Sequence, residues 1–145
     1  MKFTGSFFCS KEKISSRSFD VALMSERVAA DHNLRRFKMI GDIVTVTVDR
    51  PLGSFHPDHK DIYYTVNYGF IKGVLAPDGE EQDVYILGID HAVEEFTGKI
   101  IAIIHRIDDN EDKWVVCPDN CSFTKEEIME QVYFQEQYFH SKIII

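Results

Sequence analysis

The sequence predicts an α+β domain that is predominantly β: a small β-barrel or half-barrel with one helix packed against it. Two observations support this fold class. Several short runs of β-branched and aromatic residues are separated by turn residues, and residues 125–140 form the one segment with a clear helix start. The chain has 145 residues, which is one domain's worth of sequence.

The first predicted strand covers residues 43–48, IVTVTV, where every residue is β-branched. It ends at Asp49-Arg50-Pro51, and a loop rich in Gly, Pro and His follows over residues 52–60. A turn is predicted at residues 76–79, where proline and glycine flank an aspartate. Further strands are predicted at residues 63–66, 70–71, 84–87, 99–106 and 113–116.

The predicted helix over residues 125–140 begins at a capping box, Thr124-x-x-Glu127. Ile128 and Val132 lie on one stripe of that helix. Residues 90–96 suggest a single helical turn. The apolar residues 143–145 predict either a last strand or simple packing.

Residues 1–38 differ in charge from the remainder of the chain. They hold eight Lys/Arg and four Asp/Glu, a net charge of +4, whereas residues 39–145 have a net charge of −12. Met39 directly precedes the first strand, so one interpretation makes it the true start and residues 1–38 an N-terminal extension. The alternative is a short helix at about residues 21–36 that packs on a barrel domain formed by residues 39–145.

Composition excludes several classes of function. No apolar run approaches the ~20 residues that span a bilayer. The acidic body argues against nucleic-acid binding, which needs dense Lys/Arg, but allows a phosphate substrate where bound divalent cations invert the local field. Three cysteines form no disulfide framework and fit a reducing compartment, so we expect a cytoplasmic protein.

Two acidic clusters are the strongest functional signal. The first places Asp78, Glu80 and Asp83 within six positions, and Asp78 and Glu80 project to the same side if the chain is extended. The second cluster runs from Asp108 to Lys113 between two apolar strands, as a hairpin loop does. Each cluster alone is typical of a solvated turn. Together they predict oxygen ligands for a hard divalent cation and a lysine for a phosphate.

Other polar residues have two interpretations each. Tyr64 and Tyr68 offer phenolic donors to phosphate oxygens, although buried tyrosines with bonded hydroxyls are common. His56 and His59 lie in the loop after the first strand, and contact with solvent is the simpler interpretation of both.

At these residues the chain resembles the soluble family I inorganic pyrophosphatases. The resemblance covers residues 49–138, and its most specific part is Y-x-x-N-Y-G-F-I…D-G-E-x-x-D-V. It implies a closed, highly twisted, OB-like β-barrel with the C-terminal helix packed against it. It also implies an enzyme that hydrolyses inorganic pyrophosphate through a metal-activated water, with Mg²⁺ or Mn²⁺ as cofactor.

The resemblance assigns expected roles by position. Glu80 takes the place of the acid that helps to activate the attacking water, and Tyr64 that of the first tyrosine in the motif. Lys113, Tyr68 and Tyr138 are expected to hold phosphate oxygens. The expected metal-binding acids are Asp49 at the mouth of the site, Asp78, Asp83, Asp108 and Glu111, with Asp112 competing with Glu111.

The sequence departs from the family pattern at three places. Glu80 replaces an aspartate, and Phe139 stands where the family usually has a lysine. The family's phosphate-binding arginine has no clear counterpart, so Lys60, His56 or His59 would have to substitute. Two alternatives therefore stay open: a metal-dependent phosphohydrolase for another phosphoanhydride, and a non-catalytic barrel that binds metal or phosphate. The expected partners are pyrophosphate and further copies of this chain, without nucleic acid or membrane.

Overall fold

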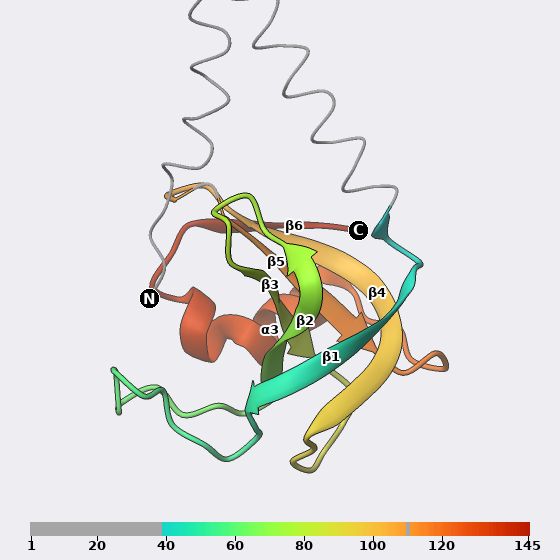
Figure 1. Ribbon diagram of the computed structural model, residues 1–145. Helices are drawn as coiled ribbons and strands as arrows, with labels where there is room; N and C mark the ends of the chain where they lie inside the picture. The colour runs from blue at the N-terminus through green and yellow to red at the C-terminus, as the bar shows by residue number, and fades with distance from the viewer. Residues whose placement is uncertain (1–38, 110) are drawn as a thin grey trace, which may run out of the picture.

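The computed structural model describes residues 39–109 and 111–145 (Figure 1). The expectations for residues 1–38 lie outside the described residues. The described elements are β1 (Ile43–Arg50), β2 (Asn67–Leu75), β3 (Glu81–Ile86), β4 (Glu95–Arg106), β5 (Glu111–Cys117), α3 (Lys125–Glu136) and β6 (Ser141–Ile144).

Five strands close into a ring. The order is β1-β2-β3-β5-β4, and β1 pairs with β4 as well as with β2, so the sheet has no open edge within the ring. β6 adds to β4 outside the ring, and β3–β5 is the one parallel pair among the described strands. This architecture confirms the predicted small, mostly β barrel with a C-terminal helix.

Two apolar clusters hold the fold together. One takes side chains from all five ring strands, as a barrel interior does, and includes Val46, Ile71 and Trp114. The other uses the alternate residues of β2 to β5, such as Tyr85 and Val115, and packs them against Ile128 and Val132 of α3. The period-2 pattern of the strands therefore serves both faces of the sheet.

The capping box predicted for α3 is present: Glu127 N–H donates to Thr124 Oγ1 at 3.1 Å, and Thr124 N–H donates to Glu127 Oε1 at 2.8 Å. The helix ends at Glu136, four residues before the predicted end. The chain turns there because Ser141 pairs with Arg106 and begins β6, which confirms a last strand at the C-terminal end. Within the described part of the chain, no helix has the length and apolarity to cross a bilayer.

Two secondary-structure predictions are wrong. Residues 63–66 do not join the barrel; they pair with the preceding loop, where Tyr64 N–H donates to Ser54 O at 2.8 Å and Gly53 N–H donates to Tyr64 O at 2.8 Å. Residues 90–96 form no helical turn. Their last two residues begin β4, because Phe96 pairs with Val46 in the strand ladder that closes the ring.

Gly69 marks the closest approach of β1 and β2. A Cβ there would lie 2.0 Å from Thr47 O and 2.8 Å from the Cα of Val48, next to a register shift in β1. We expect Gly69→Ala to lower the free energy of unfolding by about 2–3 kcal/mol, because backbone rather than a flexible side chain must move. Urea denaturation measures the effect. Lys72→Ala, at an exposed position of the same strand, is the control, and an equal loss would contradict the argument.

Candidate functional site

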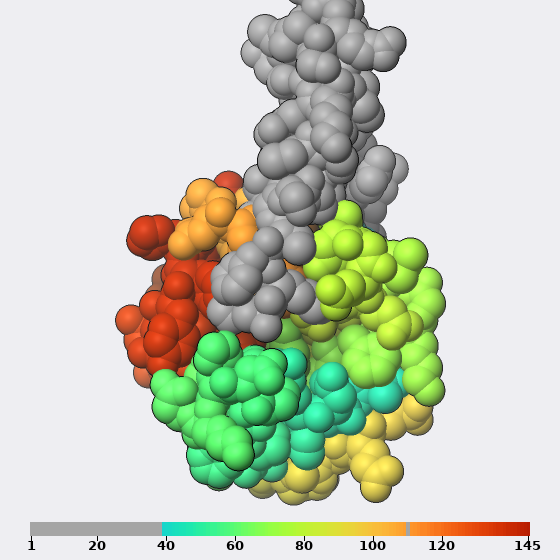
Figure 2. All heavy atoms as spheres, turned by 60° about the vertical axis from the view of Figure 1, so that its left-hand side comes forward, coloured from blue at the N-terminus to red at the C-terminus, as the bar shows by residue number. Residues whose placement is uncertain are grey.

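A cavity of about 600 Å³ opens on the face that carries α3. Figure 2 shows the loop after β1, helix α3, the β2–β3 turn and the β4–β5 turn on this face. The lining side chains come from strands β1 to β5, from the loop and from the end of α3. Elements distant in sequence thus contribute to one pocket.

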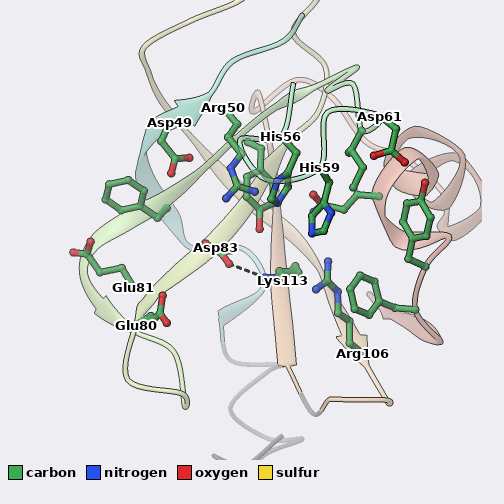
Figure 3. Close-up of a pocket in the computed structure, with 16 residues that line it drawn as sticks. Asp49, Arg50, His56, His59, Asp61, Glu80, Glu81, Asp83, Arg106 and Lys113 are labelled. Atoms are coloured by element: carbon green, nitrogen blue, oxygen red, sulfur yellow. Dashed lines mark hydrogen bonds and ion pairs between the residues drawn. The ribbon is translucent and has the colours of Figure 1, made fainter. Parts of the chain in front are cut away.

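Acidic side chains gather on one side of the pocket. Asp49 comes from the end of β1, Glu80 from the β2–β3 turn, and Glu81 and Asp83 from β3 (Figure 3). A fifth acid, Asp61, belongs to the loop. Like charges close to one another repel, and positive charges in the same pocket relieve that repulsion.

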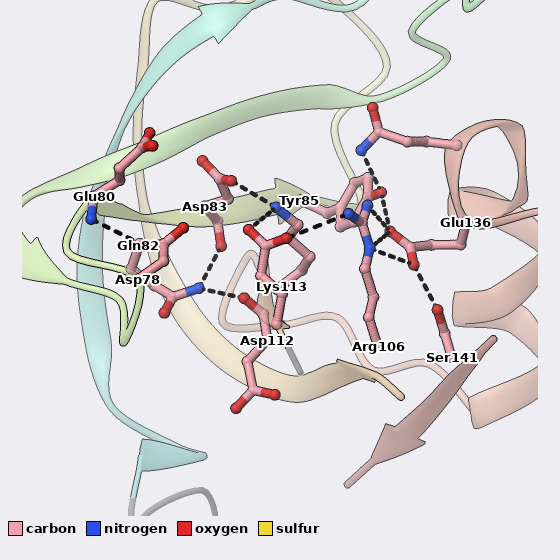
Figure 4. A network of polar contacts seen from close by, with 12 residues as sticks. Asp78, Glu80, Gln82, Asp83, Tyr85, Arg106, Asp112, Lys113, Glu136 and Ser141 are labelled. Atoms are coloured by element: carbon pink, nitrogen blue, oxygen red, sulfur yellow. Dashed lines mark hydrogen bonds and ion pairs between the residues drawn. The ribbon is translucent and has the colours of Figure 1, made fainter. Parts of the chain in front are cut away.

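Lys113 lies between two acids. It is 3% exposed on β5, and its Nζ is 2.6 Å from Asp83 Oδ2 and 2.9 Å from Glu111 Oε2 (Figure 4). β5 pairs with β3 on one side and with β4 on the other, so Lys113 does not lie at an edge of the sheet. Buried and paired, its ammonium group is held in one place at the wall of the pocket.

Arg50 supplies a second cation. Its Nη1 donates to Tyr64 Oη at 2.7 Å, and its guanidinium carbon lies 5.4 Å from the ring centroid of Tyr68. Both tyrosines are buried. Burial raises the pKa of Tyr68 well above its usual range, so the phenol stays protonated and can donate a hydrogen bond.

Arg106, the last residue of β4, supplies a third cation from the opposite side of the pocket (Figure 3). Its Nη2 donates to Glu136 Oε2 at 2.6 Å, and both side chains are almost fully buried. Burial acts to lower the pKa of Arg106, but the hydrogen bond and charge of Glu136 outweigh it. The pKa is therefore raised and the group stays charged.

The predicted site residues divide into two groups. The structure brings Asp49, Tyr68, Glu80, Asp83, Lys113 and Tyr138 together at the pocket. Lys60 is exposed and does not line it. Tyr64 is fully buried beneath the pocket and contacts it through Arg50.

Asp78 lies in a tight turn over residues 76–80, which confirms the turn predicted at residues 76–79; the chain is therefore not extended between Asp78 and Glu80. Its Oδ1 accepts from Glu80 N–H at 2.9 Å, which directs the carboxylate back to its own turn rather than to the pocket lining. Asp108 is exposed at the far end of the β4–β5 turn, and its Oδ1 accepts from His140 N–H at 3.0 Å.

Glu111 and Asp112 are the first two residues of β5, and their side chains have different partners. Glu111 is buried beside Lys113, whereas Asp112 Oδ1 lies 2.7 Å from His105 Nδ1. Asp109, next to Asp108, is 6% exposed, and neither of its carboxylate oxygens has a hydrogen-bond partner among the described residues. Glu111 Oε1 lacks one as well. Burial raises the pKa of both carboxyl groups.

The loop places His56 and His59 against the pocket, with ring centroids 4.9 Å apart. His56 is 4% exposed, so it does not have the solvent contact expected from the sequence. The N–H of Asp58 donates to His56 Nδ1 at 3.0 Å, which leaves Nε2 as the protonated nitrogen of the neutral ring.

Protonation of His56 should weaken the fold. Burial and the charge of Arg50 lower its pKa, so the unfolded chain binds this proton at a higher pH than the folded protein. The contribution of neutral His56 is present above the unfolded pKa of about 6.5 and is lost as pH falls through the folded pKa. We therefore expect the free energy of unfolding, measured by urea denaturation, to fall less for His56→Gln than for wild type when the pH is lowered from 7.5 to 5.5. The exposed His91, changed to Gln, is the control, and equal losses for all three proteins would contradict this.

Sequence reasoning missed both arginines of the pocket. Arg50 directly follows Asp49 at the end of a predicted strand, but the loop separates it from the tyrosines of the motif. Arg106 could have been found: it shares the period-2 face of Ala102 and Ile104, so the strand pattern itself indicates a buried cation. Arg50 and Arg106 therefore join His56 and His59 as pocket residues that are candidates to replace the missing arginine.

The fold and the pocket together define a closed β-barrel whose polar cavity contains both acids and buried cations, with Lys113 paired to Asp83 at its wall. No protein-family model and no curated protein matches the sequence. Solved structures do match, and they share the fold of inorganic pyrophosphatases.

Three of these structures show the extent of the similarity. The inorganic pyrophosphatase from Ehrlichia chaffeensis has a TM-score of 0.55 at 17% identity, covering 71% of this chain and 85% of its own. The enzyme from Neisseria gonorrhoeae has a TM-score of 0.51 at 21% identity, with 68% and 74% covered. The Helicobacter pylori enzyme has a TM-score of 0.51 at 17% identity, with 72% and 84% covered. The fold implied by the motif resemblance is thereby confirmed.

Proposed function

We propose that this chain hydrolyses inorganic pyrophosphate with the help of a divalent metal ion, Mg²⁺ or Mn²⁺. The observation that carries the proposal is the meeting of acids and buried cations in the pocket of a barrel that shares the fold of inorganic pyrophosphatases. Asp49, Glu80 and Asp83 offer oxygen ligands to a cation, while Arg50, Arg106 and Lys113 offer donors to a phosphate. A metal-bound diphosphate needs both.

The donor set fits a hard cation in one further respect. Within residues 39–109 and 111–145 no three His, Cys, Asp or Glu side chains lie close enough to hold a metal ion as they stand. However, buried carboxylate oxygens of Asp109 and Glu111 have no hydrogen-bond partner there, which is costly unless a cation satisfies them. We propose Asp83, Asp109 and Glu111 as holders of the metal, with Asp49 nearer the mouth.

The residues of the chain would then divide the work. A bound Mg²⁺ supplies charge neutralisation and lowers the pKa of a water molecule. Lys113, Arg50 and the protonated Tyr68 bind and orient phosphoryl oxygens, which matters because phosphoryl transfer depends mainly on positioning and charge. Glu80 is the candidate to accept the proton of the attacking water.

A second candidate is a phosphoanhydride that carries an organic group. Phe70, Tyr138 and Phe139 also line the cavity, and about 600 Å³ is the size of cavity that encloses small organic ligands. The aromatic side chains would then contact the organic part while the cations hold the phosphates.

One assay tests both candidates. Purified full-length protein is incubated with pyrophosphate or with a panel of nucleoside diphosphates and triphosphates, with Mg²⁺, with Mn²⁺ or with a chelator. Metal-dependent phosphate release from pyrophosphate alone supports the first proposal. Release from a nucleotide in preference to pyrophosphate supports the second. No release from any substrate would leave the non-catalytic alternative.

A homo-oligomer in the cytoplasm stays part of the proposal. Cys117 and Cys121 are free thiols, in keeping with a reducing compartment. Light scattering coupled to size-exclusion chromatography measures the number of subunits.

A further inference from the structure

We propose that Arg106 is an anion-binding residue of the pocket, which donates from Nη1 to a phosphoryl oxygen of the bound diphosphate. The inference rests on the proposed function for the chemical class of the ligand, although it concerns binding rather than hydrolysis. It adds to Lys113 and Arg50 a third cation on the side of the cavity opposite Asp49 and Glu80 (Figure 3).

The hydrogen bonds of Arg106 leave one nitrogen available. Nε donates to the two carboxylate oxygens of Glu136 at 3.1 and 3.2 Å, and Nη2 donates to Oε2 at 2.6 Å. Nη1 makes no hydrogen bond to a described residue, and its ion-pair partner is Glu111, whose Oε1 lies 3.6 Å away, beyond hydrogen-bond distance. Arg106 is 2% exposed, and it lines the cavity. A guanidinium that served only to neutralise Glu136 would not need to reach the pocket.

Phe139 fixes the plane of this guanidinium. The guanidinium carbon of Arg106 lies 3.7 Å from the centroid of the Phe139 ring, a close cation–π contact. The ring covers one flat face of the guanidinium, and Glu136 binds the edge that carries Nε and Nη2. Nη1 is therefore oriented before a ligand arrives. A planar, pre-oriented fork suits phosphate oxygens and spends little entropy on binding.

A continuous series of hydrogen bonds between side chains connects Arg106 to Arg50. From Glu136 it runs through Tyr85 at 2.6 Å, Gln135 at 2.7 Å and Tyr64 at 2.5 Å, and it reaches Arg50 at 2.7 Å. Figure 4 shows the part around Tyr85, Glu136 and Arg106. These hydrogen bonds join α3 to the sheet, so the packing of the core sets the spacing of the two guanidinium groups.

Binding of imidodiphosphate, a diphosphate whose bridge resists hydrolysis, tests the inference. Isothermal titration calorimetry in Mg²⁺ compares full-length wild type with Arg106→Gln/Glu136→Gln. The double change removes both buried charges and so avoids leaving Glu136 unpaired. We expect it to weaken binding by roughly ten- to a hundredfold, the effect of one lost charge-assisted hydrogen bond. Circular dichroism confirms that the variant is folded.

Two further variants complete the design. Lys142→Gln removes the same positive charge from the exposed face of β6, away from the pocket lining, and should bind as wild type does. Adding Phe139→Lys to the double variant returns a cation beside the position of the lost guanidinium. The affinity for imidodiphosphate should then be at least threefold higher than that of the double variant.

The outcomes separate this inference from the proposed function. Unchanged affinity of a folded double variant, an equal loss in Lys142→Gln, or no binding of imidodiphosphate to wild type would each overturn the role of Arg106. Arg106-dependent binding without any release of phosphate from pyrophosphate would support the inference and contradict the proposed hydrolysis. Hydrolysis of pyrophosphate together with binding that does not depend on Arg106 would support the proposed function and overturn the inference.

Discussion

Asp83→Asn should lower the rate of phosphate release from pyrophosphate in Mg²⁺ at least about 100-fold. The change keeps the shape of the side chain but removes its charge. Asp83 lines the pocket and pairs with Lys113 at 2.6 Å, so the variant loses an oxygen ligand and also one of the two contacts that position the lysine. The fold should persist, because Lys113 keeps its 2.9 Å contact with Glu111. A steady-state assay of phosphate release measures the rate.

The matched control is Asp42→Asn, which makes the same change on an exposed side chain just before β1. It should release phosphate at the wild-type rate. An Asp83→Asn variant that keeps more than a third of wild-type activity would sink the proposed site. Thermal unfolding of both variants separates a loss of chemistry from a loss of folded protein.

The barrel could be predicted from the sequence to the extent that side chains alternate between the two faces of its strands. Residues 84–87 and 113–116 were recognised as strands and lie largely in β3 and β5, where side chains alternate between the two apolar clusters. The closing contact of β1 with β4 is different, because no pattern along the chain records which strands pair. Only the resemblance to pyrophosphatases implied a closed ring.

Segments 63–66 and 90–96 show how tertiary pairing overrides local composition. Tyr63-Tyr64-Thr65-Val66 has the residues of a strand, but its hydrogen bonds go to the loop before it. In the second segment, pairing with β1 draws Glu95 and Phe96 into β4. Local propensity is a weak prior wherever a neighbouring strand offers a ladder.

The site residues could be predicted where they lie in one continuous motif. They were harder to predict where the conformation of a turn decides which residue is buried. Glu80, Asp83 and Tyr68 lie in one continuous motif, and all three line the pocket. At the β4–β5 turn, a shift of one residue decides which acid is buried, and Asp109 rather than Asp108 is enclosed. Sequence spacing alone does not resolve such a shift.

The two arginines bear on the departures from the family pattern. The sequence lacks two cations that the resemblance implies, yet Arg50 and Arg106 both line the pocket. Arg106 comes from β4 and lies directly against Phe139, the position where the resemblance implies a lysine. A cation can therefore occupy the same region of the pocket although it comes from another element of the fold.

Glu136 should be the acid whose loss costs the most stability. It is 2% exposed and accepts hydrogen bonds from Arg106, from Tyr85 at 2.6 Å and from Ser141 at 2.7 Å. Burial acts to raise its pKa, but the hydrogen bonds and charge of Arg106 outweigh burial and lower the pKa, so the buried carboxylate is ionised. Glu136→Ala removes all of these contacts and leaves Arg106 with Glu111 alone, at 3.6 Å. We expect the free energy of unfolding to fall by about 3–5 kcal/mol.

Urea denaturation of three variants separates the charge from the packing. Glu136→Gln keeps hydrogen-bonding capacity and should lose less than Glu136→Ala, while Arg106→Met/Glu136→Leu removes both charges and should lose the least. That order follows because an unpaired buried charge costs more than an absent pair. The exposed Glu130→Ala on the same helix should change stability by less than about 0.5 kcal/mol. If Glu136→Ala also lost less than about 1 kcal/mol, water would be reaching Arg106, and the chain of buried hydrogen bonds would not be what joins α3 to the barrel.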